Sequence, residues 1–138
     1  MKNLKTMLSS KDMDWETPQD FFDKLNKEFH FTLDPCATKK TAKCKKYYTK
    51  KDNGLNKNWS NETVFCNPPY GQEIKHWVKK CAEANTKVVM LIPARTDTIY
   101  FHEYIYSKAE IRFIKGRLKF GKANNSAPFP SMLVIFNK

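Results

Sequence analysis

The chain has 138 residues, which is enough for one domain with a single hydrophobic core. Its 25 Lys and Arg residues outnumber 14 Asp and Glu residues, and the formal charge of +11 favours a polyanionic partner, although a merely soluble basic surface would have the same composition. No membrane span of roughly 18 to 20 apolar residues, signal-peptide core or Cys-x-x-Cys pair occurs. We therefore expect one cytoplasmic domain with reduced cysteines, no membrane contact and no metal.

The N-terminal part predicts a tail, a helix and a strand. Residues 1–13 are polar and lack periodicity, so we expect a mobile tail there and a folded domain over residues 14–138. Thr17 and Pro18 have the form of a helix N-cap followed by proline at the first helical position. The apolar residues that then recur at helical spacing predict core contact; they are Phe21, Phe22, Leu25 and Phe29. A short strand over 31–33 ends at Asp34.

Further along, strand-like and helix-like patterns alternate. Strands are predicted over 46–49, 63–66, 87–92, 111–114 and 132–136. Helices are predicted over 73–84 and 98–106, and Asn53-Gly54 is a turn signal. This alternation indicates an α/β sheet with helices on its faces, in which ligands bind at the carboxyl ends of the strands. Asp34 and Asn67 both fall at such ends, so we expect them to converge.

An unusual polar tetrad, Asn67-Pro68-Pro69-Tyr70, stands where the buried strand 63–66 should end. Proline fixes φ near about −65° and keeps the preceding residue out of the helical region, so Asn67 and Pro68 are both held extended. The side-chain oxygen of Asn67 and the carbonyl of Pro68 can then face one way, as two acceptors with no competing local donor, which suits an exocyclic amine. Tyr70 adds a face on which a base could stack. Taken alone, Pro-Pro is more often a turn.

In this setting the tetrad resembles the hallmark of the amino-methyltransferases that use S-adenosylmethionine, and the chain is similar to the small phage-type DNA N-6-adenine methyltransferases over about residues 14 to 136. Other segments that look like this family are Trp15-Glu16-Thr17-Pro18, 31–37, 55–59, 88–95 and 114–120. The resemblance implies a compact, single-domain, Rossmann-like methyltransferase sheet with flanking helices and an antiparallel edge. It also implies a phage-encoded enzyme that methylates the N6 amine of adenine in DNA, as a monomer or weak dimer in the host cytoplasm.

The resemblance also implies a set of cofactor contacts. Asp34 would face the methionine amino group of S-adenosylmethionine, with Pro35 and Cys36 beside it and Asp52 accepting from the ribose hydroxyls. The wall near the methionine end would be formed by Trp15, Thr17 and Pro18. Many relatives have a glycine-rich turn after the first strand, whereas here Asp34 is followed by Pro-Cys-Ala-Thr. The alternatives are that Asp34 forms a turn, that Asp52 is a solvated loop residue, and that Thr17-Pro18 is only a helix cap.

The implied chemistry is direct displacement, with the two N–H groups of the amine bonded to Asn67 and to the Pro68 carbonyl. A base in a duplex would have to be flipped out and stacked on Tyr70. The alternating cations of a predicted strand could face phosphates, with Phe120 near the pocket rim, or could simply protect a strand edge; they are Lys115, Arg117 and Lys119. Alternatives are methylation of protein glutamine, of cytosine N4 or of RNA, and a catalytically silent nucleic-acid-binding protein.

Overall fold

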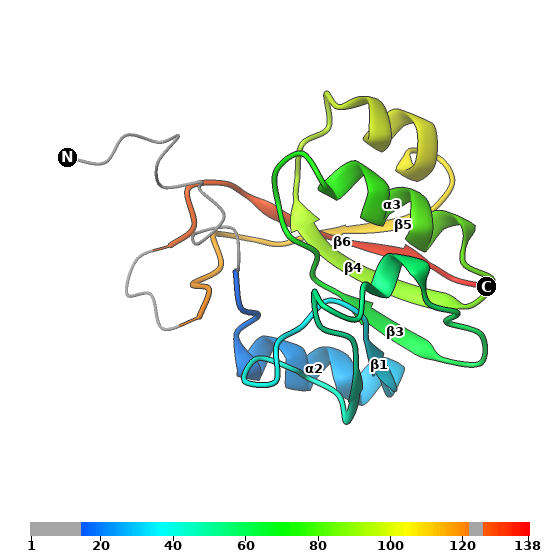
Figure 1. Cartoon of the computed structure of the whole chain (residues 1–138). Helices are drawn as coiled ribbons and strands as arrows, with labels where there is room; N and C mark the ends of the chain where they lie inside the picture. The colour runs from blue at the N-terminus through cyan, green and yellow to red at the C-terminus, as the bar shows by residue number, and fades with distance from the viewer. Residues whose placement is uncertain (1–14, 122–125) are drawn as a thin grey trace.

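The structure, a computed structural model, describes residues 15–121 and 126–138, so the expected tail over 1–13 lies outside the described residues. Within them the chain forms one six-stranded sheet with the strand order β2-β1-β3-β4-β6-β5 (Figure 1). Its strands are β1 (Leu33–Asp34), β2 (Lys46–Tyr47), β3 (Thr63–Cys66), β4 (Lys87–Pro93), β5 (Glu110–Phe113) and β6 (Ser131–Phe136). The helices are α2 (Gln19–Phe29), α3 (Ile74–Glu83), the 3-10 helix η1 (Gly54–Asn56) and the π-helix η2 (Phe101–Ile105).

Two kinds of strand pairing divide the sheet. Strands β2, β1, β3 and β4 are parallel, whereas β6 is antiparallel to both β4 and β5. The expected mixed α/β sheet with an antiparallel edge is therefore confirmed. Because β1, β3 and β4 run the same way, their carboxyl ends meet at one edge of the sheet. This places Asp34 and Asn67 at the same edge, as the strand predictions required, with Ala94 beside them at the end of β4.

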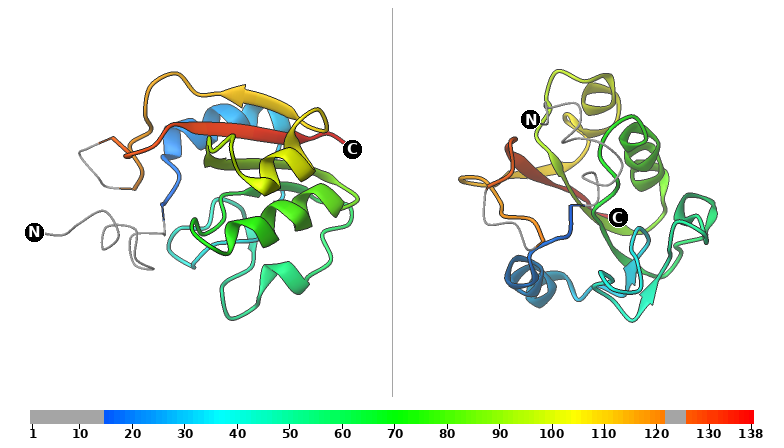
Figure 2. Two further views of the ribbon diagram at one scale, coloured as in Figure 1. Left: turned by 90° about the horizontal axis from the view of Figure 1, so that it is seen from above. Right: turned by 60° about the vertical axis from the view of Figure 1, so that its left-hand side comes forward.

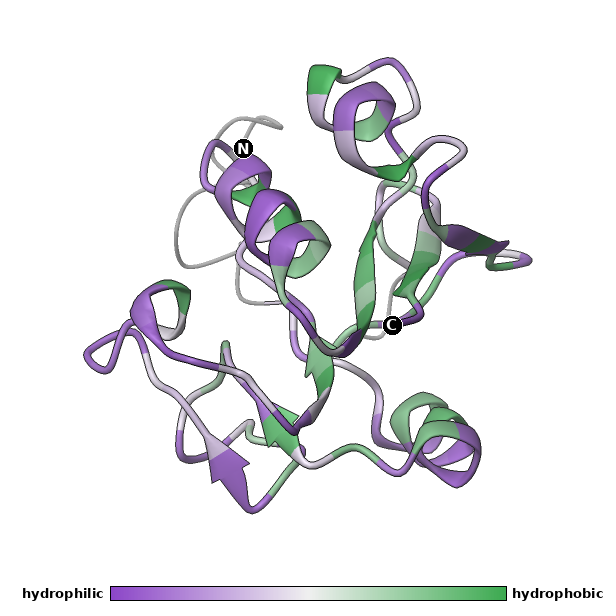
Figure 3. Cartoon of the chain, turned by 90° about the vertical axis from the view of Figure 1, so that its right-hand side faces the viewer, coloured by the Kyte–Doolittle hydropathy of each residue, from purple (hydrophilic) through white to green (hydrophobic). Residues whose placement is uncertain are grey.

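The helices cover the two faces of the sheet unequally. Helices α3 and η2 lie side by side on one face, and α2 covers the other (Figures 1 and 2). Apolar residues follow β4 and β6 through the middle of the molecule, while the outer sides of α3 are polar (Figure 3). On the α2 face, the ring of Phe22 contacts Phe65 of β3 at 5.1 Å between centroids. This contact fixes α2, and the segment that precedes it, against the strand that leads into Asn67.

The start of α2 differs from the prediction. The N-cap position is occupied by Pro18, with no side-chain hydrogen bond to the first turn, and the helix begins at Gln19. Thr17 is buried and its hydroxyl oxygen accepts a hydrogen bond from the side chain of Asn67 instead. The prediction that Thr17 caps the helix is therefore wrong, because a tertiary partner takes the place of the helix N–H groups.

The predicted strand through the basic segment 114–120 is also wrong. Strand β5 ends at Phe113, whose register partner Met132 is followed by only one more residue of β6 in that direction, Ser131. Gly116 then adopts φ 75°, a left-handed conformation that interrupts an extended strand. The segment consequently leaves the sheet as irregular chain, and Lys115, Arg117 and Lys119 do not protect a strand edge.

The helix predicted over 98–106 is observed over residues 99–105. Five residues of it, Phe101–Ile105, form a π-helix, with Phe101 and Ile105 buried against the sheet and α3. The remaining helix prediction, 73–84, is close to the observed α3. Strands β3 and β4 also agree with their predictions to within one residue.

Candidate active site

A cavity of about 560 Å³ lies where the carboxyl ends of β1 and β3 meet. We call it the strand-end cavity. Most of its wall is made by four segments, residues 15–17, 34–38, 53–55 and 67–73, with further contributions from residues between 41 and 50, Phe65 and Trp77. It therefore brings together most of the residues that the sequence singled out, namely Trp15, Thr17, Asp34, Pro35, Cys36, Asn67, Pro68, Pro69 and Tyr70. Its volume lies within the roughly 300 to 1,000 Å³ typical of small-molecule sites.

Asp34 supplies a buried carboxyl group to this cavity. It ends β1 and is 4% exposed, and its two oxygens accept hydrogen bonds from the backbone N–H groups of Lys43 at 3.1 Å and Cys36 at 3.3 Å. Burial raises the pKa of Asp34 to about 6, although both hydrogen bonds and the charge of Lys43 oppose the shift. A carboxyl held in this way is poised to ionise when a cation approaches it.

Gly54 supplies a close backbone contact beneath Asp34. A Cβ atom at this position would lie 2.1 Å from the carbonyl oxygen of Pro35, a distance that no side chain permits. The indole N–H of Trp59 donates to the Gly54 carbonyl at 3.1 Å and holds it in place. The chain thus has a glycine against the turn after β1, but it comes from another segment. Sequence reasoning interpreted Asn53-Gly54 as a turn signal and missed this packing role.

The amide of Asn67 is held by partners from distant segments. Its nitrogen donates to the backbone carbonyl of Trp15 at 2.6 Å and to the hydroxyl oxygen of Thr17 at 2.9 Å. Its oxygen accepts from the hydroxyl of Tyr70 at 2.6 Å. The expectation of an acceptor with no competing local donor is therefore wrong, because the tetrad brings the Tyr70 hydroxyl back onto Asn67. The second lone pair of the amide oxygen still remains for another donor.

Tyr70 is part of an aromatic cluster beside this amide. It is 6% exposed, its hydroxyl also lies 3.1 Å from the carbonyl oxygen of Leu91, and burial raises its pKa well above the usual range. Its ring contacts Phe129 and Phe120 in edge-to-face geometry, with centroids 5.7 and 6.3 Å away. Phe120 therefore lies against the wall of the cavity, and Phe129, which no sequence pattern indicated, lies there with it.

Trp15 completes the cluster and leaves one donor unused. Its ring meets Phe120 and Phe129 edge-on at 5.6 and 5.3 Å. The indole nitrogen is shielded from solvent and has no hydrogen-bond partner among the described residues.

Two residues that were assigned to the cofactor lie outside the cavity wall, Pro18 and Asp52. The carboxylate of Asp52 is exposed and accepts hydrogen bonds from the backbone N–H and the hydroxyl of Thr49, which lower its pKa. Its neighbours Lys50 and Asn53 line the cavity, whereas Asp52 closes the turn between them.

The basic segment 114–120 runs to the cavity wall. Figure 1 shows it in orange, projecting from the sheet beside the start of the described chain. Just beyond it, the backbone N–H of Gly121 donates to the carbonyl of Glu16 at 2.8 Å. Its side chains Lys115, Arg117 and Lys119 are exposed. Exposed lysine pairs also follow β1 and β2, a signal that the sequence contained and we did not use; they are Lys39, Lys40, Lys50 and Lys51.

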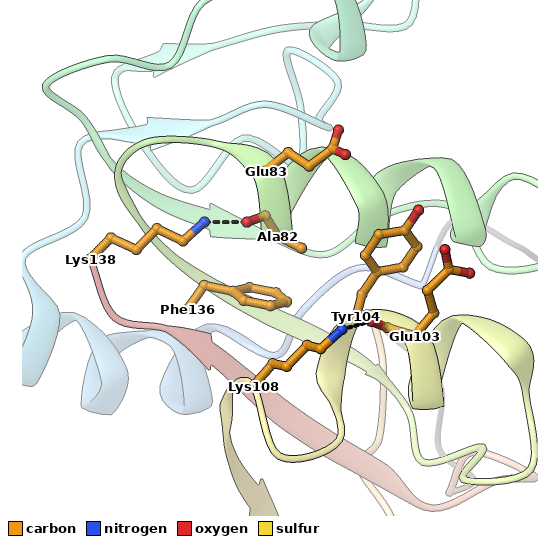
Figure 4. A pocket seen from close by; sticks show the side chains of 7 residues that line it. All are labelled: Ala82, Glu83, Glu103, Tyr104, Lys108, Phe136 and Lys138. Atoms are coloured by element: carbon orange, nitrogen blue, oxygen red, sulfur yellow. Dashed lines mark hydrogen bonds between the residues drawn. The ribbon is translucent and has the colours of Figure 1, made fainter.

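A second hollow of about 320 Å³ lies at the opposite end of α3, around the ring of Phe136 (Figure 4). There the ammonium group of Lys138 donates to the carbonyls of Ala82 and Ala84, at the end of α3. No residue that the sequence singled out lines it. Within the described residues, no helix has the length and apolarity to span a membrane, and no three His, Cys, Asp or Glu side chains are placed to hold a metal ion.

The fold and the site define an α/β protein with a cavity at the carboxyl ends of its parallel strands, the place where sheets of this kind bind ligands. The model of the DNA N-6-adenine-methyltransferase (Dam) family matches residues 3–138, and the chain belongs to this family. It is 33% identical over 109 residues to the DNA N-6-adenine-methyltransferase of Escherichia phage T1, and this match covers 75% of this chain and 45% of that protein. It is 40% identical over 63 residues to the putative methyltransferase YfdM of Escherichia coli K12, and this match covers 41% of this chain and 69% of that protein. The chain thus matches about half the length of the phage T1 protein.

Proposed function

We propose that this chain transfers a methyl group from S-adenosylmethionine to the N6 amine of adenine in DNA. Membership of the family and the name of the phage T1 relative support the reaction and the substrate. The observation that carries the proposal is that Asn67 and Asp34, at the ends of neighbouring strands, line one cavity of suitable size. The strand order and the position of the cavity support a compact, Rossmann-like methyltransferase sheet.

The residues of the strand-end cavity fit S-adenosylmethionine. When bound, this cofactor supplies an electrophilic methyl group on a sulfonium. The buried carboxyl of Asp34 has further lone pairs to accept from the methionine ammonium, which would favour its ionised form. Pro35 and Cys36 would lie beside that contact, and Trp15 and Thr17 would form the wall between it and Asn67.

The target amine would be held by two acceptors. The amide oxygen of Asn67 would accept one N–H and the carbonyl of Pro68 the other, which favours a tetrahedral nitrogen whose lone pair faces the methyl group. As the bond from the amine nitrogen to the methyl carbon forms, the bond from that carbon to the sulfonium sulfur would break, the neutral thioether would leave, and the nitrogen would release one proton to water. An adenine in duplex DNA would be flipped out of the stack to reach this point, and we propose that the ring of Tyr70 stacks against it.

DNA would be held through its phosphates by cations around the cavity. Just beyond the segment 114–120, the backbone N–H of Gly121 donates to Glu16 of the cavity wall, and Lys50, from the pair after β2, lines the cavity itself. Contacts of this kind bind without reading sequence. We also propose that the reaction takes place in the cytoplasm, which is that of the host cell if the protein is phage-encoded.

Nucleoside analysis tests the proposal. Unmethylated DNA is incubated with the protein and S-adenosylmethionine, digested to nucleosides and analysed by mass spectrometry. We expect N6-methyl-2′-deoxyadenosine from the parent protein and none from Asn67→Ala. The affinity of this variant for the cofactor should stay within about threefold of the parent, because Asn67 acts on the target amine. If only N4-methylcytosine is found, the assignment of adenine as the target base is wrong. If the cofactor binds and no base is methylated, the substrate class is wrong.

A further inference from the structure

The neighbours of the Asn67 amide fix its orientation, because one of them cannot donate a hydrogen bond. The Trp15 carbonyl is only an acceptor, so the group 2.6 Å from it must be the –NH₂ end of the amide. The oxygen end then faces the Tyr70 hydroxyl. The catalytic acceptor proposed above is therefore aimed by contacts on its opposite, nitrogen side.

Thr17 takes the second hydrogen of that –NH₂ group. Its hydroxyl oxygen lies 2.9 Å from the Asn67 nitrogen, and Thr17 is 4% exposed. Water thus has little access to replace the hydroxyl, and loss of the hydroxyl would leave a donor unsatisfied. Without the hydroxyl, the nitrogen end of the amide would keep only the Trp15 carbonyl and the oxygen end only the Tyr70 hydroxyl, so the plane of the amide would be held less firmly.

From these contacts we infer that Thr17 is a positioning residue for methyl transfer: its hydroxyl fixes the plane of the Asn67 amide so that the amide oxygen faces the target amine. The inference rests on the proposed function. It explains why the segment before α2 is bonded to the tetrad rather than capping its own helix. A preorganised acceptor needs no rearrangement when the amine arrives, and a small misplacement can cost about 100-fold in rate.

Three substitutions test Thr17. Thr17→Val removes the hydroxyl at nearly constant volume and should lower kcat by about 10- to 100-fold, with the Kd for S-adenosylmethionine and the KM for DNA within about threefold of the parent. Thr17→Ser keeps the hydroxyl and should restore most of kcat. Thr17→Ala also lacks the hydroxyl, and it replaces the valine variant if that protein does not fold.

Thr86→Val is the matched control. Like Thr17, Thr86 is a buried threonine, and its hydroxyl donates to the backbone carbonyl of Glu62. Thr86 precedes β4, so it lies at the opposite end of the strands from the strand-end cavity. Its replacement should lower stability and leave kcat unchanged. A valine variant of Thr17 with kcat within twofold of the parent overturns the inference, as does a variant whose activity falls only because cofactor affinity falls in parallel.

The side-chain amide of Asn67 gives a readout that does not depend on activity. In an NMR spectrum its two –NH₂ protons, assigned with Asn67→Ala, should exchange slowly in the parent and at least tenfold faster in Thr17→Val. Unchanged exchange overturns the inference. If the parent transfers no methyl group but shows protected amide protons that Thr17→Val exposes, the proposed function fails and the positioning contact stands.

Discussion

At the scale of single residues, Asp34 is the group whose charge matters most. Its pKa is raised from 3.8 to about 6, mainly by burial. Between these two pH values the folded protein binds more protons than the unfolded chain, so its free energy of unfolding should fall as the pH rises from about 4 to 6. The loss is on the order of 3 kcal/mol, and it persists above pH 6. A bound cation beside Asp34 would offset it.

We therefore predict that the affinity for S-adenosylmethionine depends on pH through Asp34. Below about pH 6 the carboxyl group of Asp34 is mostly neutral in the unliganded protein. The affinity should then decrease with falling pH, with a slope that approaches tenfold per pH unit. Calorimetric titration between pH 5 and 8 measures this dependence. Asp34→Asn should bind weakly at every pH and lose this dependence. A parent protein with the same affinity at pH 5 and 7.5 would show that Asp34 does not hold the ammonium group.

At the scale of elements, the turn after β1 depends on a neighbour from far along the chain. Gly54 begins η1 and lies against the Pro35 carbonyl, so any side chain there must displace the residues next to Asp34. Gly54→Ala should lower the free energy of unfolding by about 1 to 3 kcal/mol, in denaturant titrations, through overpacking. The displaced turn should also weaken the binding of S-adenosylmethionine.

Gly116→Ala separates this effect from the general cost of replacing glycine. A Cβ at Gly116 would meet nothing within 4 Å, and only its φ of 75° opposes a side chain, at a cost of roughly 1 to 2 kcal/mol. The affinity of the Gly116→Ala variant for S-adenosylmethionine should equal that of the parent. Equal cofactor affinities for the two alanine variants would contradict the proposed role of Gly54.

The elements that matched their predictions are those with a strong local pattern. The continuous apolar run Val88–Ile92 and the run Thr63–Cys66 lie in buried strands, since parallel strands with both faces covered are apolar throughout. The segment 114–120 failed because a strand needs a partner, and β6 offers none beyond Ser131. Pairing is a non-local property that alternating lysines cannot reveal.

At the scale of the whole molecule, the charge of +11 predicts that DNA binding depends steeply on salt. Each phosphate contact should contribute about −0.9 to the slope of log affinity against log salt. Replacing Lys115, Arg117 and Lys119 together with glutamine should make the slope shallower and weaken binding to all sequences alike, as measured by titration with DNA across a salt series.

A charge-matched control replaces three exposed lysines away from the strand-end cavity, two on α2 and one before β5; they are Lys24, Lys27 and Lys108. This variant should keep most of the salt dependence. If both triple variants change the slope equally, the effect is one of net charge, and the segment 114–120 does not contact phosphates.

The sequence by itself indicated which residues belong to the candidate site and roughly where they lie. Prolines restrict their own backbone and that of the preceding residue, so Asn67-Pro68-Pro69-Tyr70 after an apolar strand is a local signal, and Asp34 at a strand end is another. Both residues line the cavity that was expected from an α/β sheet. These inferences needed only short-range geometry and the rule that parallel strands end at one edge.

Only the tertiary structure decided how those groups are held. Thr17 lies 50 residues from Asn67 along the chain and bonds to its amide, Gly54 packs against the Pro35 carbonyl in the turn after β1, and Tyr70 donates its hydroxyl hydrogen to Asn67. Asp52, for which the resemblance implied a cofactor contact, lies outside the cavity wall and bonds to Thr49. Each of these outcomes depends on which segments meet when the sheet forms, because a hydrogen bond or a close backbone contact between distant residues leaves no pattern in either segment alone.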